Sequence, residues 1–222
     1  MNALLGYQSA LLVRSQRWLA PVILYAAFLA VGVQSGQPVL DSLAYAAAAL
    51  LPVAAWLVRI CVTNEPPAAR SCTAAAVGPW RAQLACLLSA FLASAVLGAV
   101  ATLVVSVISD PASTDHRTAV NRLGASAAGL LAMLVSVLVG TAIGAVTSWP
   151  LMRSPGRAVS VMLLASLLSL VTTGSPAKAV MTGLVSGSRD GVVPVPLLPV
   201  MGAAVLAMAA MGAACGLASR RG

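Results

Sequence analysis

Long apolar runs alternate with short polar connections along the chain, and this pattern predicts membrane-spanning helices. A helix needs about 20 predominantly apolar residues to cross the hydrocarbon of a bilayer. Six runs come close to that length, although the fifth is short. They cover residues 18–33, 39–60, 83–108, 123–149, 158–173 and 199–219. We therefore predict an all-α, polytopic bundle of six transmembrane helices that forms a single domain over residues 1–222.

Composition supports this class and excludes an ordinary soluble domain. Apolar residues make up 60% of the 222 residues and charged residues only 8%, whereas soluble proteins are about half apolar and a quarter charged. A net charge of +8 would suggest nucleic-acid binding in a soluble chain. The sequence contains no aromatic-interleaved basic patch and no recognised nucleic-acid module, so we assign the basic residues to membrane topology and expect no nucleic-acid partner.

The longest polar interruption lies between the second and third runs, over residues 59–82. It contains a Pro-Pro pair, one acidic residue and three arginines, and it includes a small-residue segment that can form a short helix. Its charged residues are Arg59, Glu65, Arg70 and Arg81. Because such a segment cannot lie in hydrocarbon, it must stand in water and could dock a soluble partner.

Two further segments are too short or too polar to cross the membrane. In residues 1–16, Leu4, Tyr7 and Leu11 share one helical stripe, which predicts an interfacial helix leading into the first span. Residues 174–191 contain a mostly apolar piece, 177–185. Pro176, Arg189 and Asp190 flank this piece, and Lys178 lies near its start. We predict that residues 174–191 form a re-entrant or interfacial hairpin on the outer face.

Six spans place both termini on one side, and the basic residues favour the cytoplasm for that side. The cytoplasmic face then holds nine basic residues with one acid, Glu65, and the outer face four basic residues with four acids. The cytoplasmic basic residues are Arg14, Arg17, Arg59, Arg70, Arg81, Arg153, Arg157, Arg220 and Arg221. The outer charged residues are Asp41, Asp110, Asp115, Arg117, Arg122, Lys178, Arg189 and Asp190.

The sequence contains few motifs of the kind that catalytic sites use. It contains no HExxH, no GxxxxGK[ST] and no paired intramembrane aspartates. A metal site around His116 with Asp110 and Asp115 is conceivable, but a solvated loop is the simpler interpretation because no second His or Cys accompanies them. Cys61, Cys72, Cys86 and Cys215 form no CxxC and are read as free thiols. We expect no catalytic, cofactor or metal site in this chain.

Small residues and one proline suggest where helices pack or bend. Glycines four residues apart let two helices approach closely, and two such pairs occur, Gly140 with Gly144 and Gly212 with Gly216. Pro52 falls within the second apolar run, where a proline removes a backbone donor and bends the helix. A kink tolerated by neighbouring helices is one interpretation, and a functional hinge is the other.

These features together resemble a type-2 ABC transporter permease, the compact six-span kind encoded apart from its ATPase. The resemblance rests on the arginine-containing lead-in LLVRSQRWLAPVILYAAF and on the connection NEPPAARSCTAAAVGPWRAQL. That connection opens with Glu65 and ends at Gly78 and Arg81. A partly apolar outer segment before the last span completes the likeness, which covers nearly the whole chain and is mainly architectural.

The resemblance implies a function and a set of partners. A coupling helix between Pro67 and Pro79 would dock on a separate ABC ATPase subunit, with Glu65, Arg70, Gly78 and Arg81 at the docking loop. Two permease subunits, identical or related, would form the path, and ATP with Mg would bind only to the ATPase. The implied location is the bacterial cell membrane. Because no charge lies at the centre of a span, we expect export of a hydrophobic or amphiphilic compound.

Two other functions remain open from the sequence. A secondary transporter of the inverted-repeat type would fit the similar rhythm of the two halves, although no matching residues link them. A non-transporting membrane protein, such as an immunity or scaffold subunit, would need only a packed bundle. An ATPase that co-purifies with the chain would favour the ABC permease over both of these alternatives.

Overall fold

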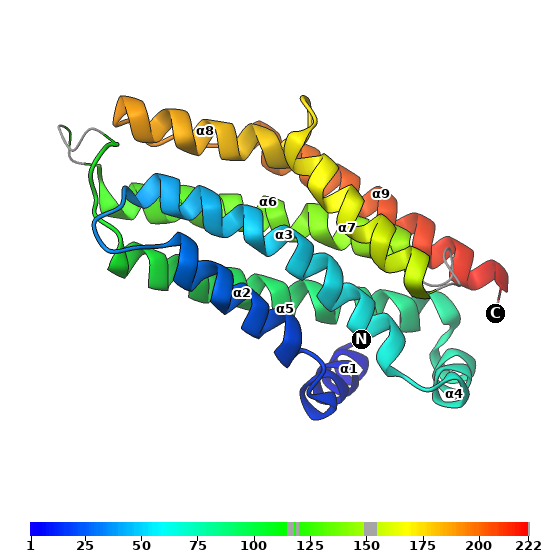
Figure 1. Cartoon of the computed structure of the whole chain (residues 1–222). Helices are drawn as coiled ribbons and strands as arrows, with labels where there is room; N and C mark the ends of the chain where they lie inside the picture. The colour runs from blue at the N-terminus through cyan, green and yellow to red at the C-terminus, as the bar shows by residue number, and fades with distance from the viewer. Residues whose placement is uncertain (115–117, 119, 149–154, 222) are drawn as a thin grey trace.

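The computed structural model describes residues 1–114, 118, 120–148 and 155–221, and these residues are almost entirely helical. In the described ranges there are nine helices and no strand. They are α1 (Asn2–Ser15), α2 (Leu19–Gly32), α3 (Val39–Asn64), α4 (Pro67–Val77), α5 (Pro79–Ile108), α6 (Arg122–Thr147), α7 (Pro155–Val171), α8 (Pro176–Asp190) and α9 (Leu197–Arg221). The long helices lie side by side in one elongated bundle (Figure 1).

Prolines and glycines set several of the helix boundaries. Pro67, Pro79 and Pro176 stand in the first turn of α4, α5 and α8, where a missing backbone N–H costs no hydrogen bond. A single residue, Gly78, separates α4 from α5 and has φ +90°. Only glycine adopts that conformation without steric cost, so Gly78 allows the chain to change direction sharply between the two helices.

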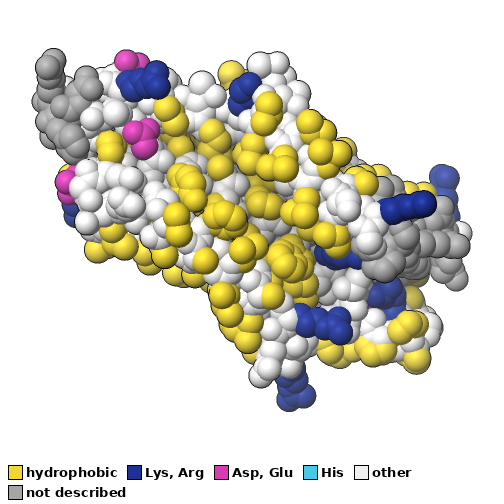
Figure 2. Space-filling view, in the orientation of Figure 1, with side chains coloured by type: hydrophobic (Ala, Val, Ile, Leu, Met, Phe, Trp, Pro, Cys, Tyr) yellow, Lys and Arg dark blue, Asp and Glu magenta, His cyan; other side chains and the backbone are white. Residues whose placement is uncertain are grey.

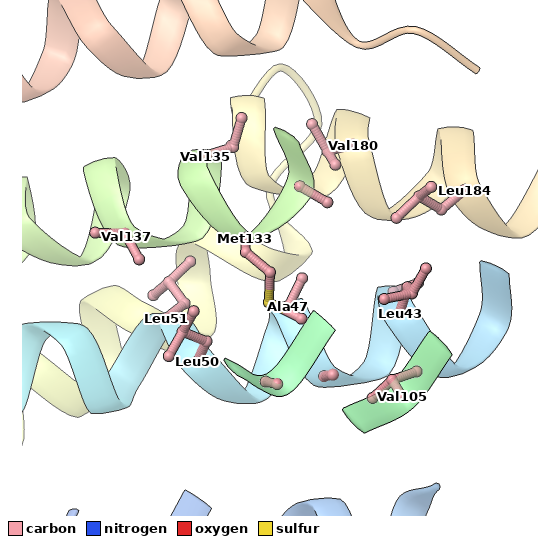
Figure 3. Packing of buried hydrophobic residues seen from close by; sticks show 14 of the residues in the cluster. Leu43, Ala47, Leu50, Leu51, Val105, Met133, Val135, Val137, Val180 and Leu184 are labelled. Atoms are coloured by element: carbon pink, nitrogen blue, oxygen red, sulfur yellow. The ribbon is translucent and has the colours of Figure 1, made fainter. Parts of the chain in front are cut away.

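Helices α3 and α6 form the centre of the bundle. In each of them 67% of the most apolar 18-residue window is buried, compared with 33% in α5 and 17% in α9. Figure 3 shows Met133 of α6 reaching toward Ala47 of α3, beside Leu50 and Leu51. The core is therefore built where these two helices cross, and the other helices pack around it.

Gly140 and Gly144 lie at the closest contact between α3 and α6. A Cβ atom at Gly140 would stand 2.6 Å from the Leu51 carbonyl oxygen, and one at Gly144 would stand 2.6 Å from Val58 Cβ. In contrast, a Cβ atom at Gly212 or Gly216 would have no neighbour within 4 Å. The two similar sequence motifs therefore have different surroundings within this chain, because only the first faces another helix.

The periphery of the bundle is strongly apolar, as expected for a surface that contacts lipid. Exposed hydrophobic side chains occur on α2, α5, α7 and α9. On the face shown in Figure 2, hydrophobic side chains occupy the middle of the molecule. Of the described helices, four are long and apolar enough to cross a membrane, α3, α5, α6 and α9. Helix α2 is apolar but has only 14 residues. The all-helical class, with several helices apolar enough to cross a membrane, is confirmed, whereas six spans are not.

The predicted re-entrant or interfacial hairpin on the outer face is not confirmed. Residues Pro176–Asp190 form one continuous helix, α8, which meets α7 at a 45° bend. Counted together, α7 and α8 can make a fifth span or a re-entrant segment. Helix α8 stays continuous because Ala177, Val180 and Leu184 recur at helical spacing and are buried against the core. Lys178 lies at the bend, where its Nζ donates to the Val171 carbonyl oxygen at 2.7 Å.

The two ends of the bundle differ. The ends of α1 and α4 and the C-terminus lie at one end, which we call the basic end (Figure 1). At the opposite end, backbone hydrogen bonds join the connection after α2, the connection after α5 and the end of α8. Asp110 exchanges bonds of 3.0 Å with Gln37 and Val39, and Thr114 N donates to the Ser188 carbonyl oxygen at 3.0 Å. Pro52 lies inside α3, which continues through it, so a hinge there stays a prediction.

Candidate functional site

A buried carboxylate, Glu65, joins three helices at the basic end. Glu65 follows the last residue of α3 and is only 3% exposed. Its side chain accepts hydrogen bonds from Tyr7 Oη at 3.4 Å and Gln8 Nε2 at 3.4 Å, both on α1. It also accepts a bond of 2.6 Å from Thr73 Oγ1 on α4. One side chain thereby connects α1, the end of α3 and α4.

Three more hydrogen bonds strengthen the same junction. Asn64 Nδ2 donates to the Leu11 carbonyl oxygen at 3.0 Å, which holds α1 against the end of α3. The Arg70 guanidinium of α4 donates to the Val62 carbonyl oxygen and, at 3.4 Å, to that of Glu65. The last carbonyls of a helix lack partners within it and carry partial negative charge, so Arg70 stabilises the end of α3 while it fixes α4 there.

Tyr7 remains a hydrogen-bond donor to this carboxylate at neutral pH. Burial raises the pKa of the Tyr7 hydroxyl above its ordinary value of 10, and the nearby negative charge of Glu65 raises it further. Both effects disfavour a second negative charge beside the first. The bond between α1 and Glu65 is therefore retained throughout the physiological pH range.

Helix α4 is fixed at its base but open on its outer side. None of its residues is buried, and Ser71, Cys72, Ala75 and Ala76 are exposed. At the start of α5, the Arg81 guanidinium lies 5.5 Å from the centre of the Trp80 ring, and both side chains are exposed. The small side chains of α4 and the adjacent Trp80 and Arg81 form a continuous segment of chain that a partner can approach.

A cavity of about 440 Å³ lies behind α4, between this helix, the first turns of α5 and the end of α9. Its lining includes Glu65, Arg70, Ala74, Gln83, Cys86 and Ala218. Gln83 is 6% exposed, and its Nε2 has no hydrogen-bond partner among the described residues. A buried amide donor without a partner normally indicates an unseen ligand or water.

The structure brings together only some of the predicted site residues. Glu65 and Arg70 meet at the junction of α3 and α4, Gly78 ends α4, and Arg81 lies beyond it on Trp80. The short helix predicted between Pro67 and Pro79 is present as α4, whereas its role stays a prediction. Sequence reasoning missed the contributions of Gln8, Thr73 and Gln83, since no motif marks them. Tyr7 alone was signalled, by its place on the N-terminal stripe.

The exposure of Cys72 allows a direct test of which side α4 faces. Cys61, Cys86 and Cys215 are buried, whereas Cys72 is exposed. We expect a membrane-impermeant maleimide to label the native chain at Cys72 in inverted vesicles and not in intact cells. Mass mapping of the adduct checks the site, and Cys72→Ser is the control. Labelling of Cys72 in intact cells would place α4 outside and contradict the predicted orientation.

The arrangement as a whole holds a surface helix in a fixed position, and it lacks the grouping of side chains expected of a metal centre. In the described part of the chain no group of three or more His, Cys, Asp or Glu could hold a metal ion. Asp115 and His116, considered above as ligands, lie outside the described residues. Comparisons of the chain with protein-family models, curated proteins and solved structures give no match in any of the three.

Proposed function

We propose that this chain is the membrane-spanning subunit of an ATP-driven ABC exporter, located in the cell membrane with its basic end in the cytoplasm. In this proposal the chain crosses the bilayer six times, with α2 as a short first span and α7 with α8 as a broken fifth. It pairs with a second permease subunit, and α4 docks a separate ATPase. The chain binds no nucleotide itself, and ATP with Mg stays on the ATPase.

The observation that carries the proposal is the way α4 is attached. A coupling element must be exposed to its partner and rigidly connected to the helices that move. Helix α4 has no buried residue, yet Thr73 and Arg70 bond it to the end of α3. Helices α3 and α6 are the two most central helices of the bundle. A force on α4 would therefore reach the core directly through α3.

The grooves of the bundle support an amphiphilic cargo. One groove of about 700 Å³ is lined by α6, α7 and α9. Its walls are mostly apolar, but Thr147, Ser169 and Thr172 also line it. A compound with a hydrocarbon part and a few polar atoms would match such walls better than an ion would, because neither the apolar side chains nor the hydroxyls carry a charge.

Isolation of the chain in a gentle detergent tests the proposal. We expect a P-loop ATPase to co-purify with the affinity-tagged chain at a one-to-one ratio, as measured by mass spectrometry of the intact complex. A variant with Ala75→Trp and Ala76→Trp, which crowds the exposed side of α4, should lose the ATPase and remain folded. Ala127→Trp, at an exposed site near the opposite end of α6, serves as the control. Purification without any ATPase, together with transport driven by an ion gradient, would refute the proposal.

The bent pair of α7 and α8 favours a second candidate, a secondary transporter. Such transporters bind substrates and ions beside helices that are interrupted within the membrane, and the 45° bend is an interruption of that kind. In that case Lys178, whose Nζ lies at the bend, would be the charged group nearest the site. Transport that requires a proton or sodium gradient and no ATP would support this candidate.

A further inference from the structure

We infer that the cavity behind α4 binds the head group of a phospholipid that carries both a phosphate and a primary ammonium, namely phosphatidylethanolamine. The inference does not depend on an ATPase partner, because it concerns the chain in its bilayer. It rests on three properties of the cavity: its position, the charges in its wall and an unused hydrogen-bond donor.

The position of the cavity matches the depth of lipid head groups. Trp80 and Arg81 precede it on α5, and both are exposed. Tryptophan and arginine side chains concentrate at the membrane interface. From Leu92 onward, the exposed side chains of α5 are hydrophobic over a long stretch. The cavity residues Gln83 and Cys86 lie between these two regions, at the level where phosphates and amines of the inner leaflet are found.

The wall of the cavity presents one negative and one positive side chain. Glu65 supplies a carboxylate and Arg70 a guanidinium. The carboxylate accepts bonds from neutral donors, two of which are long, at 3.4 Å. A carboxylate offers about four acceptor positions, so it can also accept from an ammonium N–H. A purely anionic head group would leave this acid next to a like charge, which is unfavourable.

The unused donor, Gln83 Nε2, belongs to the first turns of α5. Gln83 Nε2 has no hydrogen-bond partner among the described residues, although the side chain is only 6% exposed. The cavity-lining residues of α5, Pro79, Ala82, Gln83 and Cys86, belong to its first turns, where a helix carries partial positive charge. A phosphate oxygen would therefore be stabilised by the helix terminus, by the guanidinium of Arg70 and, once the buried amide rotates toward the cavity, by Gln83 Nε2.

The volume is sufficient for a head group. A cavity of about 440 Å³ falls within the range of about 300–1,000 Å³ that is typical of small-molecule sites. The phosphoethanolamine group would enter it while the acyl chains remain in the bilayer. Phosphatidylcholine has three methyl groups in place of the ammonium protons, so it is larger and cannot donate to Glu65.

Native mass spectrometry of the detergent-purified chain tests this site. Three lipids with identical palmitoyl and oleoyl chains are titrated, phosphatidylethanolamine, phosphatidylcholine and phosphatidylglycerol. We expect one ethanolamine lipid to bind about tenfold more tightly than the choline lipid, the difference expected from about one hydrogen bond to a charged group. Equal binding of the ethanolamine and choline lipids would overturn the inference, as would tighter binding of the glycerol lipid.

Matched variants locate the binding in this cavity. Ala74 lines the cavity, whereas its neighbour Ala75 is exposed and does not line it. Ala74→Phe should therefore abolish the tenfold preference, and Ala75→Phe should retain it. Gln83→Leu should weaken binding of the ethanolamine and choline lipids alike, because both carry the phosphate, while Ser89→Ala, which removes another buried donor of α5 outside this cavity, should weaken neither. A preference that survives Ala74→Phe, together with affinities that Gln83→Leu leaves unchanged, would place the lipid elsewhere and refute the proposed site.

Discussion

Replacing Gly140 by alanine is expected to destabilise the bundle by about 1–3 kcal/mol, the usual cost of overpacking a close contact. The new Cβ would stand 2.6 Å from the Leu51 carbonyl oxygen and 2.8 Å from Ala54 Cβ. Backbone atoms of α3 cannot rotate away as a flexible side chain can, so α3 and α6 must separate. The free energy of unfolding in mixed detergent micelles, measured by SDS titration, gives the size of the effect.

The same substitution on α9 provides the control. A Cβ at Gly212 would meet nothing within 4 Å, and alanine has the higher helix propensity. Gly212→Ala should therefore leave the free energy of unfolding unchanged or raise it by up to about 1 kcal/mol. Equal stability of Gly140→Ala and the native chain would contradict the packing of α3 against α6 described above. An equally large loss in Gly212→Ala would do so too, because the loss could not then be attributed to helix contact.

The contrast between these two glycine pairs indicates which features of the fold can be predicted from the sequence. The apolar runs, the prolines and the distribution of arginines predicted long helices, a short polar helix and a basic end, because each depends on local chemistry. The face by which a helix packs against another helix does not depend on local chemistry in this way. Lipid is as apolar as a protein core, so the sequence of α6 or α9 does not distinguish a lipid-facing side from a buried one. Similar GxxxG patterns therefore gave no means of separating Gly140 from Gly212.

The candidate site was predictable in part for a related reason. Glu65 and Arg70 stood out because charges are rare in this chain, and rarity is visible in a sequence. Their partners were not visible, since Gln8 and Thr73 are ordinary polar residues and Gln8 is 57 positions from Glu65 along the chain. One continuous helix over α8 was not predicted because its length falls below that of a span, whereas its buried side chains show that packing against the core holds it as a helix.

Removal of the Glu65 carboxylate is expected to release α4 from the bundle. In Glu65→Ala, the buried Gln8 amide loses its acceptor, which should lower the free energy of unfolding by about 1–3 kcal/mol. The Thr73 hydroxyl can then donate to the Ala69 carbonyl oxygen instead, so α4 itself should remain helical. Hydrogen exchange at the amides of α4 and α1 measures the effect. We expect faster exchange in both helices and unchanged exchange in the core of α3 and α6.

A threonine pair separates the attachment of α4 from the general effect of losing a buried acid. Thr73→Val removes the 2.6 Å bond to Glu65 and keeps the carboxylate and its bonds to α1. Thr63→Val is the matched control, because the Thr63 hydroxyl bonds only to carbonyls of its own helix, at Arg59 and Ile60. If α4 transmits force from an ATPase, Thr73→Val should weaken ATPase binding by about tenfold, the equivalent of one hydrogen bond to a charged group. Thr63→Val should leave the affinity unchanged. Unaltered exchange in α4 of both Glu65→Ala and Thr73→Val would mean that other contacts fix this helix, and the route from α4 to α3 would have to be sought at the start of α5.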